Sequence, residues 1–404
     1  MKNKLLNKVI SVFLMFLFII TITSCGATSP DYGPSYDSSS SEKDDFPNDS
    51  EDNFEYQAGQ LTSCAYNDND HFTFWKELMS SNQEGEGIFK NYYEKYSFKA
   101  FNRLKVKVPI NISVKVHLLD ENQNIVFTGI PDATGNTYLY PKTYQETYNI
   151  CLEYVKVNEE EPTMQYEVIS SDTEFIIEAT NKIQDSIQLM FVIDTTGSMG
   201  DEMGYLNAEI IDIIEQVKNE FPSSVIELAI MLYRDKSDDY VTKYSDFTTN
   251  ISAQQEFLSK QRAGGGGDFE EAVDVALEEA SQKQWSKNAK TKILVHVADA
   301  PAHDEEVNKW NKATIDLASK GVRIISVASS GINKKTEYFF RCQSILTNGT
   351  YVYLTNDSGI GNDHLEATVE QRPIVEYLNA SLVRLIKGYH TGVFEEPVYY
   401  RQQK

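Results

Sequence analysis

The stretch FVIDTTGSMGDEM (residues 191–203) passes from apolar residues directly into an aspartate that is followed by hydroxyl side chains at alternate positions. With the residues before it, SIQLM, it forms a near-continuous apolar run, the pattern of a strand buried on both faces of a parallel sheet. Ligands of open parallel sheets collect beyond the carboxyl ends of their strands. Asp194, Thr196 and Ser198 therefore stand where a ligand site is expected.

Strand-like and helix-like segments alternate over the second half of the chain. We predict buried strands, each followed by apolar residues at helical spacing, at residues 186–194, 225–235, 292–299, 323–330 and 351–355. This alternation predicts an α/β domain over residues 186–392, with a doubly wound, mostly parallel, Rossmann-like sheet. Right-handed crossovers place every strand-to-helix loop at one edge of that sheet. We expect residues 393–404 to form a C-terminal tail.

The preceding residues 56–183 are dominated by short strands and turns. They predict a small all-β sandwich, with one short helix at residues 71–81. The stretch DENQNIVFTGIPDATGNTYLYP (residues 120–141) resembles the β-sandwich of carboxypeptidase-regulatory domains.

The N-terminus has the features of an export signal. Three lysines precede an apolar run over residues 9–22, and Cys25 follows small residues. Residues 1–24 resemble a bacterial lipoprotein signal peptide, which implies lipid attachment, such as palmitate, at Cys25 after cleavage. The alternatives are an ordinary signal peptide with an unrelated cysteine and an uncleaved anchor helix. All of these predict an exported protein at the cell membrane or outer envelope, and residues 25–55, rich in Ser and Asp, predict a flexible tether.

The net charge and the cysteine content indicate which partners, metal motifs and disulfides the chain can have. The formal net charge of −23 makes nucleic acid an unsuitable partner. Three cysteines remain besides Cys25, and their wide spacing fits no zinc motif. We expect either one disulfide, for example between Cys64 and Cys151, or three buried thiols, and the sequence leaves the pairing among Cys64, Cys151 and Cys342 open.

Three loops at the predicted functional edge carry acidic residues. The first holds Asp194, the second is GGGGD (residues 264–268) and the third contains Asp299. Carboxylate and hydroxyl oxygens suit hard divalent cations such as Mg²⁺, Ca²⁺ or Mn²⁺. The glycine loop ends in Asp268 rather than in the Lys-Ser/Thr of a phosphate-binding loop, so we expect no nucleotide.

These loops resemble the von Willebrand factor type A domain with its metal-ion-dependent adhesion site. Asp194, Thr196 and Ser198 match the Asp-x-Ser-x-Ser motif, and Asp299 matches the later aspartate. The resemblance implies that these four residues hold the cation, directly or through water, with one position open to a partner. Asp268 stands where many adhesion domains have threonine, so we expect it to be a fifth metal ligand. Asp235 is either a residue behind the ligands or the partner of Arg234 in a salt bridge, and Asp304 is expected to cap a helix beside a solvated His303.

Three functions remain open. The first is a lipid-anchored surface protein whose metal site binds an unidentified protein or mediates adhesion. In the second, the metal only holds the three loops together in an envelope scaffold. The third is a hydrolase, which we regard as the weakest because the chain has no HExxH or GxSxG motif and Ser198 has no evident base. We therefore expect no catalytic residues.

Overall fold

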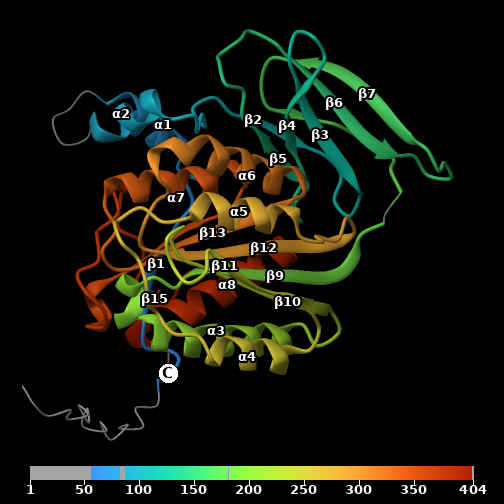
Figure 1. Cartoon of the computed structure of the whole chain (residues 1–404). Coiled ribbons are helices and arrows are strands. Elements are labelled where there is room, and N and C mark those ends of the chain that lie inside the picture. The colour runs from blue at the N-terminus through green and yellow to red at the C-terminus, as the bar shows by residue number, and fades with distance from the viewer. Residues whose placement is uncertain (1–55, 82–86, 181, 403–404) are drawn as a thin grey trace, which may run out of the picture. The chain divides into compact units, whose positions relative to one another are not determined.

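The strand that ends at Asp194 lies inside an eight-stranded sheet in the computed structural model, which describes residues 56–81, 87–180 and 182–402 (Figure 1). The strand order is β11-β10-β9-β12-β13-β14-β1-β15. Strands β10, β9, β12, β13 and β14 are parallel, whereas β11, β1 and β15 run antiparallel to their neighbours. A mostly parallel α/β sheet is therefore confirmed. The strands are β1 (Thr62–Tyr66), β9 (Gln184–Asp194), β10 (Val225–Tyr233), β11 (Thr242–Thr248), β12 (Ala289–Ala298), β13 (Val322–Ala328), β14 (Tyr351–Leu354) and β15 (Glu376–Tyr377).

Helices cover both faces of this sheet (Figure 1). One face packs against α5 (Val273–Gln282), α6 (Val307–Ser319) and α7 (Lys334–Leu346), and the other against α3 (Met203–Glu220), α4 (Ile251–Ser259) and α8 (Leu378–Thr391). Alternate residues of β9 point to the two faces, so that Met190 and Val192 join one core and Leu189, Phe191 and Ile193 join the other. This double burial explains the continuous apolar run of the strand.

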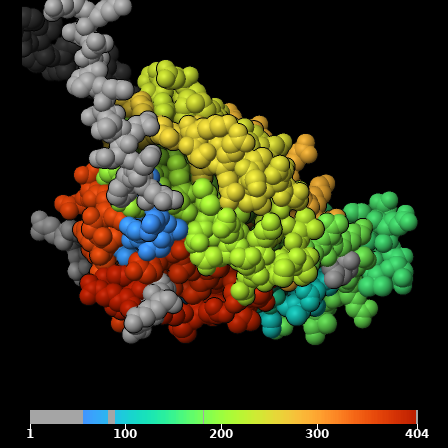
Figure 2. Space-filling model, turned by 90° about the horizontal axis from the view of Figure 1, so that it is seen from below, coloured from blue at the N-terminus to red at the C-terminus, as the bar shows by residue number. Residues whose placement is uncertain are grey.

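The first strand of the described chain belongs to the large sheet, although we assigned residues 56–183 to a separate sandwich. Ser63 pairs with Leu354 of β14 and Thr62 with Tyr377 of β15. A strand of five residues finds its partners about 290 residues away, and its local sequence carries no signal of this. Figure 2 shows the blue start of the described chain at the surface, between green residues and the orange and red residues of the C-terminal part.

Two smaller sheets form most of the segment before β9. One has the order β5-β2-β8 and the other the order β4-β3-β6-β7, and all pairs except β2 with β8 are antiparallel. The sheets support the predicted β-rich segment in part, because two helices accompany them. These elements are α1 (Phe72–Ser80), α2 (Gly87–Lys95), β2 (Leu104–Lys107), β3 (Val114–Leu119), β4 (Ile125–Gly129), β5 (Asn136–Leu139), β6 (Tyr148–Val155), β7 (Pro162–Ile169) and β8 (Thr173–Glu174).

This segment shares its core with the large sheet. The ring of Phe98 lies 5.6 Å from that of Trp310 in α6, and the hydroxyl of Tyr338 in α7 donates to the carbonyl of Phe98. The described residues form one compact unit. The domain limits that we drew from the sequence stay a prediction.

The cysteines and the termini complete the description. Cys64, Cys151 and Cys342 are buried free thiols, so the alternative of three thiols holds for the described part of the chain. The predicted signal peptide, the predicted tether and Cys25 lie outside the described residues. Among the helices that the structure describes, none combines the length and the apolar character needed to span a bilayer.

Candidate metal centre

The loop after β9 turns its polar groups inward at the carboxyl edge of the sheet. Asp194 is fully buried, and its Oδ1 accepts hydrogen bonds from the backbone N of Thr196 at 2.9 Å and from its Oγ1 at 2.7 Å. The hydroxyls of Thr196 and Ser198 lie 3.2 Å apart. The other carboxylate oxygen, Oδ2, is buried and has no hydrogen-bond partner in the structure. Asp194, Thr196 and Ser198 therefore lie together, as predicted, and Ser198 is exposed to solvent.

The end of β12 brings a second buried carboxylate to this place. Asp299 is buried, and its Oδ1 also has no hydrogen-bond partner in the structure. Burial raises the pKa of Asp299, and a side-chain hydrogen bond from Ser198 offsets part of this effect. Burial, followed by the charge of Asp299, raises the pKa of Asp194. The two aspartates that the sequence paired are therefore close enough to repel one another.

A third buried carboxylate, which the sequence analysis missed, comes from Glu271. It is 3% exposed, and its Oε2 has no hydrogen-bond partner in the structure. A Cβ atom placed on Gly266 would lie 3.3 Å from Glu271 Oε1 and 3.5 Å from Thr196 Cβ, so the carboxylate adjoins the first loop. Burial and then the charges of Asp194, Asp235 and Asp299 raise the pKa of Glu271 to about 9.

The sequence FEEA (residues 269–272) favours a helix, which is why the sequence analysis did not single out this residue. Helix α5 begins only at Val273, and Glu271 instead pairs with Ala302 as a parallel β-bridge, with its N donating to the carbonyl of Pro301. This bridge ties the glycine loop to the loop that follows β12. A carboxylate directly after GGGGD and before an apolar helix is the sequence signal that could have found it.

Backbone hydrogen bonds hold the first two loops together. Gly197 N donates to the carbonyl of Gly265 at 3.1 Å, and Gly264 N donates to that of Thr195 at 3.0 Å. Gly197 lies so close that a Cβ there would approach the Gly265 carbonyl oxygen to 2.9 Å. Gly265 and Gly266 have φ near +80°, a conformation that favours glycine. The glycines therefore shape this loop.

The donor set fits a divalent cation. Unpartnered buried carboxylate oxygens are costly, and three of them gather at Asp194, Asp299 and Glu271. A dication would relieve their mutual repulsion, and the hydroxyls of Thr196 and Ser198 complete an all-oxygen set of the kind that Ca²⁺, Mg²⁺ or Mn²⁺ takes.

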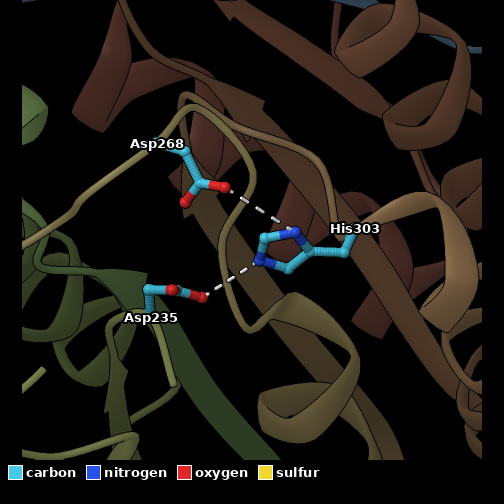
Figure 3. Close-up of side chains that lie close together, drawn as sticks. All are labelled: Asp235, Asp268 and His303. Carbon is cyan, nitrogen blue, oxygen red and sulfur yellow. Dashed lines mark hydrogen bonds and ion pairs between the residues drawn. The ribbon is translucent and has the colours of Figure 1, made fainter. Parts of the chain in front are cut away.

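Asp268 and Asp235 join a different group, with His303 (Figure 3). His303 Nε2 lies 3.2 Å from Asp235 Oδ1, and its Nδ1 lies 4.0 Å from Asp268 Oδ2. The place of Asp268 in the all-oxygen centre stays a prediction.

One of the two alternatives for Asp235 and the expectation for Asp304 were wrong. Arg234 does not pair with Asp235, because its guanidinium donates to the carbonyls of Thr195 and Arg262. Asp304 does not cap a helix, because its carboxylate forms ion pairs with Lys95 at 2.6 Å and Lys335 at 2.7 Å.

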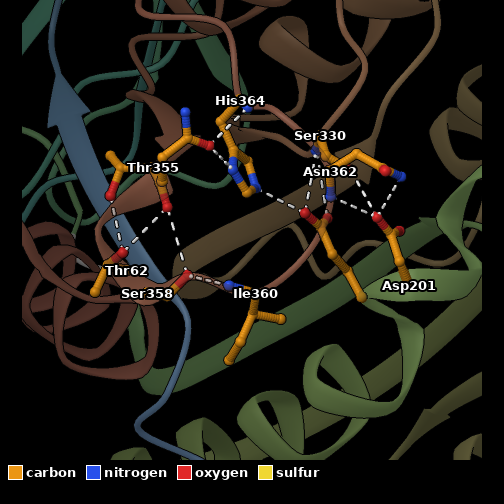
Figure 4. Close-up of polar contacts among 10 residues, drawn as sticks. Thr62, Asp201, Ser330, Thr355, Ser358, Ile360, Asn362 and His364 are labelled. Atoms are coloured by element: carbon orange, nitrogen blue, oxygen red, sulfur yellow. Dashed lines mark hydrogen bonds and ion pairs between the residues drawn. The ribbon is translucent and has the colours of Figure 1, made fainter.

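The loop over residues 356–364 contacts the residues that directly follow the first loop (Figure 4). Asp201, just after the first loop, accepts hydrogen bonds from the N and Nδ2 of Asn362, each at 2.7 Å. The buried Glu202 beside it accepts from His364 Nε2 at 2.7 Å. The start of the described chain joins the same region, because Thr62 Oγ1 lies 2.8 Å from Thr355 Oγ1.

Comparison with known proteins identifies the part of the chain that carries this site. Residues 188–360 match the family model of the von Willebrand factor A domain. The chain is 26% identical over 161 residues to the alpha-protein kinase vwkA of Dictyostelium discoideum, a match that covers 39% of this chain and 25% of that protein. It is 27% identical over 192 residues to the putative ariadne-like RING finger protein R811 of Acanthamoeba polyphaga mimivirus, covering 42% of this chain and 18% of that protein. The chain thus spans a quarter or less of the length of these relatives.

Solved structures that match the chain have low sequence identity and low TM-scores. The conserved hypothetical protein BatB from Bacteroides thetaiotaomicron is 11% identical with a TM-score of 0.33, covering 44% of this chain and 92% of that one. A von Willebrand factor type A protein from Catenulispora acidiphila is 12% identical with a TM-score of 0.30, covering 51% and 40%. The pilus adhesin SpaC from Lactobacillus rhamnosus GG, in its open conformation, is 11% identical with a TM-score of 0.35, covering 68% and 35%.

Proposed function

We propose that this chain, whose residues 188–360 match the family model of the von Willebrand factor A domain, binds a divalent cation at the edge of its large sheet and uses it to hold a protein partner. Domains of this family commonly bind divalent metal ions and are typically interaction modules rather than enzymes. The proposed ligands are Asp194, Thr196, Ser198, Asp299 and Glu271. The observation that supports this most directly is the meeting of three buried carboxylates, each with an unpartnered oxygen.

The number of carboxylates bears on the metal and on the partner. Three carboxylates around one dication leave a formal charge of about −1, a set that favours Ca²⁺ or Mn²⁺ over the strict octahedron of Mg²⁺. The same excess charge weakens the attraction of the ion for an acidic side chain of a partner. We therefore propose a partner chosen mainly by neutral or basic contacts with the rim loops.

Membrane attachment through a lipid on Cys25 belongs to the same proposal and rests on the sequence alone. Labelled palmitate should enter the chain, and Cys25→Ser should abolish the label and release the chain from the membrane fraction. Label that persists in the variant would contradict attachment at Cys25.

The experiment that tests the main function compares partner capture by the full chain with and without a chelator. Asp194→Asn should lose both Ca²⁺ binding and partner capture. Asp201→Asn serves as the matched control, because Asp201 is an exposed acid just after the same loop. Thermal unfolding of each variant shows that the fold persists.

Two other functions predict different outcomes. If the cation only holds the loops together, its removal lowers the unfolding temperature and leaves capture unchanged for the chain that remains folded. A hydrolase would need a base beside a nucleophile, whereas Ser198 Oγ contacts the hydroxyl of Thr196.

A further inference from the structure

Asp235, Asp268 and His303 form a second group of potential metal ligands beside the all-oxygen centre (Figure 3). One potential ligand atom from each of the three side chains lies within 4.8 Å of the other two. The side chain of Asp235 is 10% exposed, that of His303 21% and that of Asp268 59%. The group is therefore anchored in the fold on one side and open to solvent on the other.

Three separate loops supply these residues, and the backbone fixes them relative to one another. Asp235 follows β10, Asp268 ends the glycine loop and His303 follows β12. The carboxylate of Asp238 accepts hydrogen bonds from Asp235 N at 3.1 Å and from Gly266 N at 2.9 Å, which joins the first two loops. The bridge between Glu271 and Ala302 joins the glycine loop to the third. The backbone contacts of these three loops thus hold the group together.

We propose that Asp235, Asp268 and His303 bind a second divalent cation of the Zn²⁺ class, distinct from the cation of the all-oxygen centre. An imidazole nitrogen suits Zn²⁺ and Co²⁺, whereas Mg²⁺ and Ca²⁺ prefer oxygen ligands only. Two carboxylates and one imidazole give three protein ligands, the number that leaves a fourth position of a tetrahedral zinc ion open to water or to a partner's side chain.

The geometry requires only a small adjustment. Ligand atoms of a tetrahedral zinc ion lie about 3.3 Å apart, given metal–ligand distances of about 2.0 Å. The spacing in this group is at most 4.8 Å, and the exposed side chain of Asp268 follows four glycines, so a rotation of this side chain can close the difference.

The competing interpretation is that His303 only bridges two acids. Its two nitrogens face different carboxylates, so the imidazole lies between both acids. The two interpretations differ in one respect. Only the zinc site predicts that zinc binds and that the imidazole of His303 is one of its ligands.

Calorimetric titration of ZnCl₂ into the full chain saturated with Ca²⁺ tests the proposal. We expect one zinc ion per chain, at least tenfold weaker zinc binding in His303→Gln and in Asp268→Asn, and unchanged Ca²⁺ affinity in His303→Gln. Asp194→Asn should show the reverse, with weakened Ca²⁺ and retained Zn²⁺ binding. His71→Gln is the matched control, because His71 also lies beside a carboxylate, 3.7 Å from Glu370, but belongs to no group of three potential metal ligands among the described residues.

Cobalt gives an independent readout of the imidazole ligand. The visible absorption of bound Co²⁺ should change in His303→Gln and stay the same in His71→Gln. Absence of zinc binding, or zinc binding that His303→Gln leaves intact, would overturn the proposal while leaving the all-oxygen centre untouched. Circular dichroism of each variant excludes a loss of fold as the cause.

Discussion

His364 Nε2 lies 2.7 Å from Glu202 Oε1, and both side chains are buried. Glu202 immediately precedes α3, close behind the metal loop, whereas His364 ends the rim loop that begins at Asn356. The backbone N of Ser330, after β13, also donates to the carboxylate of Glu202. One buried acid thus connects the first loop with two others of the rim.

We expect Glu202→Ala to lower the free energy of unfolding by about 3 kcal/mol, because it leaves buried donors on His364 and Ser330 unpaired. Urea denaturation measures this difference. Asp201→Ala removes an acid from the neighbouring, exposed position and should cost about 1 kcal/mol or less. Equal losses in the two variants would show that burial of the pair contributes nothing.

Glu271→Gln should weaken Ca²⁺ binding roughly tenfold to a hundredfold, because it removes a charged oxygen from the proposed centre. Isothermal calorimetry on the metal-free chain measures the affinity. Glu270→Gln is the control, since Glu270 forms an ion pair with Lys335 at 3.0 Å. If Asp268→Asn weakens Ca²⁺ binding and Glu271→Gln does not, the third carboxylate is Asp268, as the sequence resemblance implied.

Lys292→Met should stabilise the protein by about 2 kcal/mol at pH 7. Burial, followed by the charge of Arg323, lowers the pKa of Lys292 from 10.5 to about 8, which corresponds to about 3 kcal/mol, and the lost hydrogen bond to the carbonyl of Ser286 offsets about 1 kcal/mol.

The pH dependence of this effect has a definite sign. Between pH 8 and 10.5 the unfolded chain holds a proton on Lys292 that the folded chain has lost, so this residue makes the native protein more stable as the pH rises. The advantage of the Met variant should therefore shrink from pH 8 to pH 10 in urea denaturation experiments. An advantage that is constant over this range would mean that folding does not lower the pKa of Lys292.

Asp68→Asn should destabilise the protein by about 3 to 5 kcal/mol, because it removes a negative charge that pairs with the fully buried guanidinium of Arg341. Asp68 receives hydrogen bonds from Arg341 Nε at 3.0 Å and from Nη2 at 2.5 Å. Thermal or urea unfolding checks the value. The surface pair of Lys312 and Asp316 provides the control, since Asp316→Asn should change stability by less than about 0.5 kcal/mol.

The sequence predicted those parts of the fold that local patterns encode. The apolar run before Asp194 and the helical spacing after it correspond to β9 and α3, and the functional edge follows from strand direction alone. The place of β1 could not be predicted, because its pairing with Leu354 depends on residues far along the chain.

The candidate site was predicted to a similar degree. Asp194, Thr196, Ser198 and Asp299 meet as expected, since each follows or ends a buried strand. Glu271 was missed because helix propensity continues through FEEA (residues 269–272), whereas in the structure a backbone contact with Pro301 holds this segment out of the helix. Competition between local propensity and a distant hydrogen bond is not visible in one sequence.

The position of β1 also determines how the protein would respond to mechanical force. Because β1 runs antiparallel to β14, its first residue, Thr62, lies at the same edge of the sheet as the carboxyl ends of the parallel strands. The carboxylate of Glu209 in α3 accepts hydrogen bonds from the backbone N of Gly59, Gln60 and Leu61 just before it. A force on the chain before Thr62 and an opposing force from a partner bound at the proposed metal centre would thus act on the same edge of the sheet. Helix α3 lies between the two points. Tension would pass through a short path within the large sheet and its helix, and the two small sheets would carry none of it.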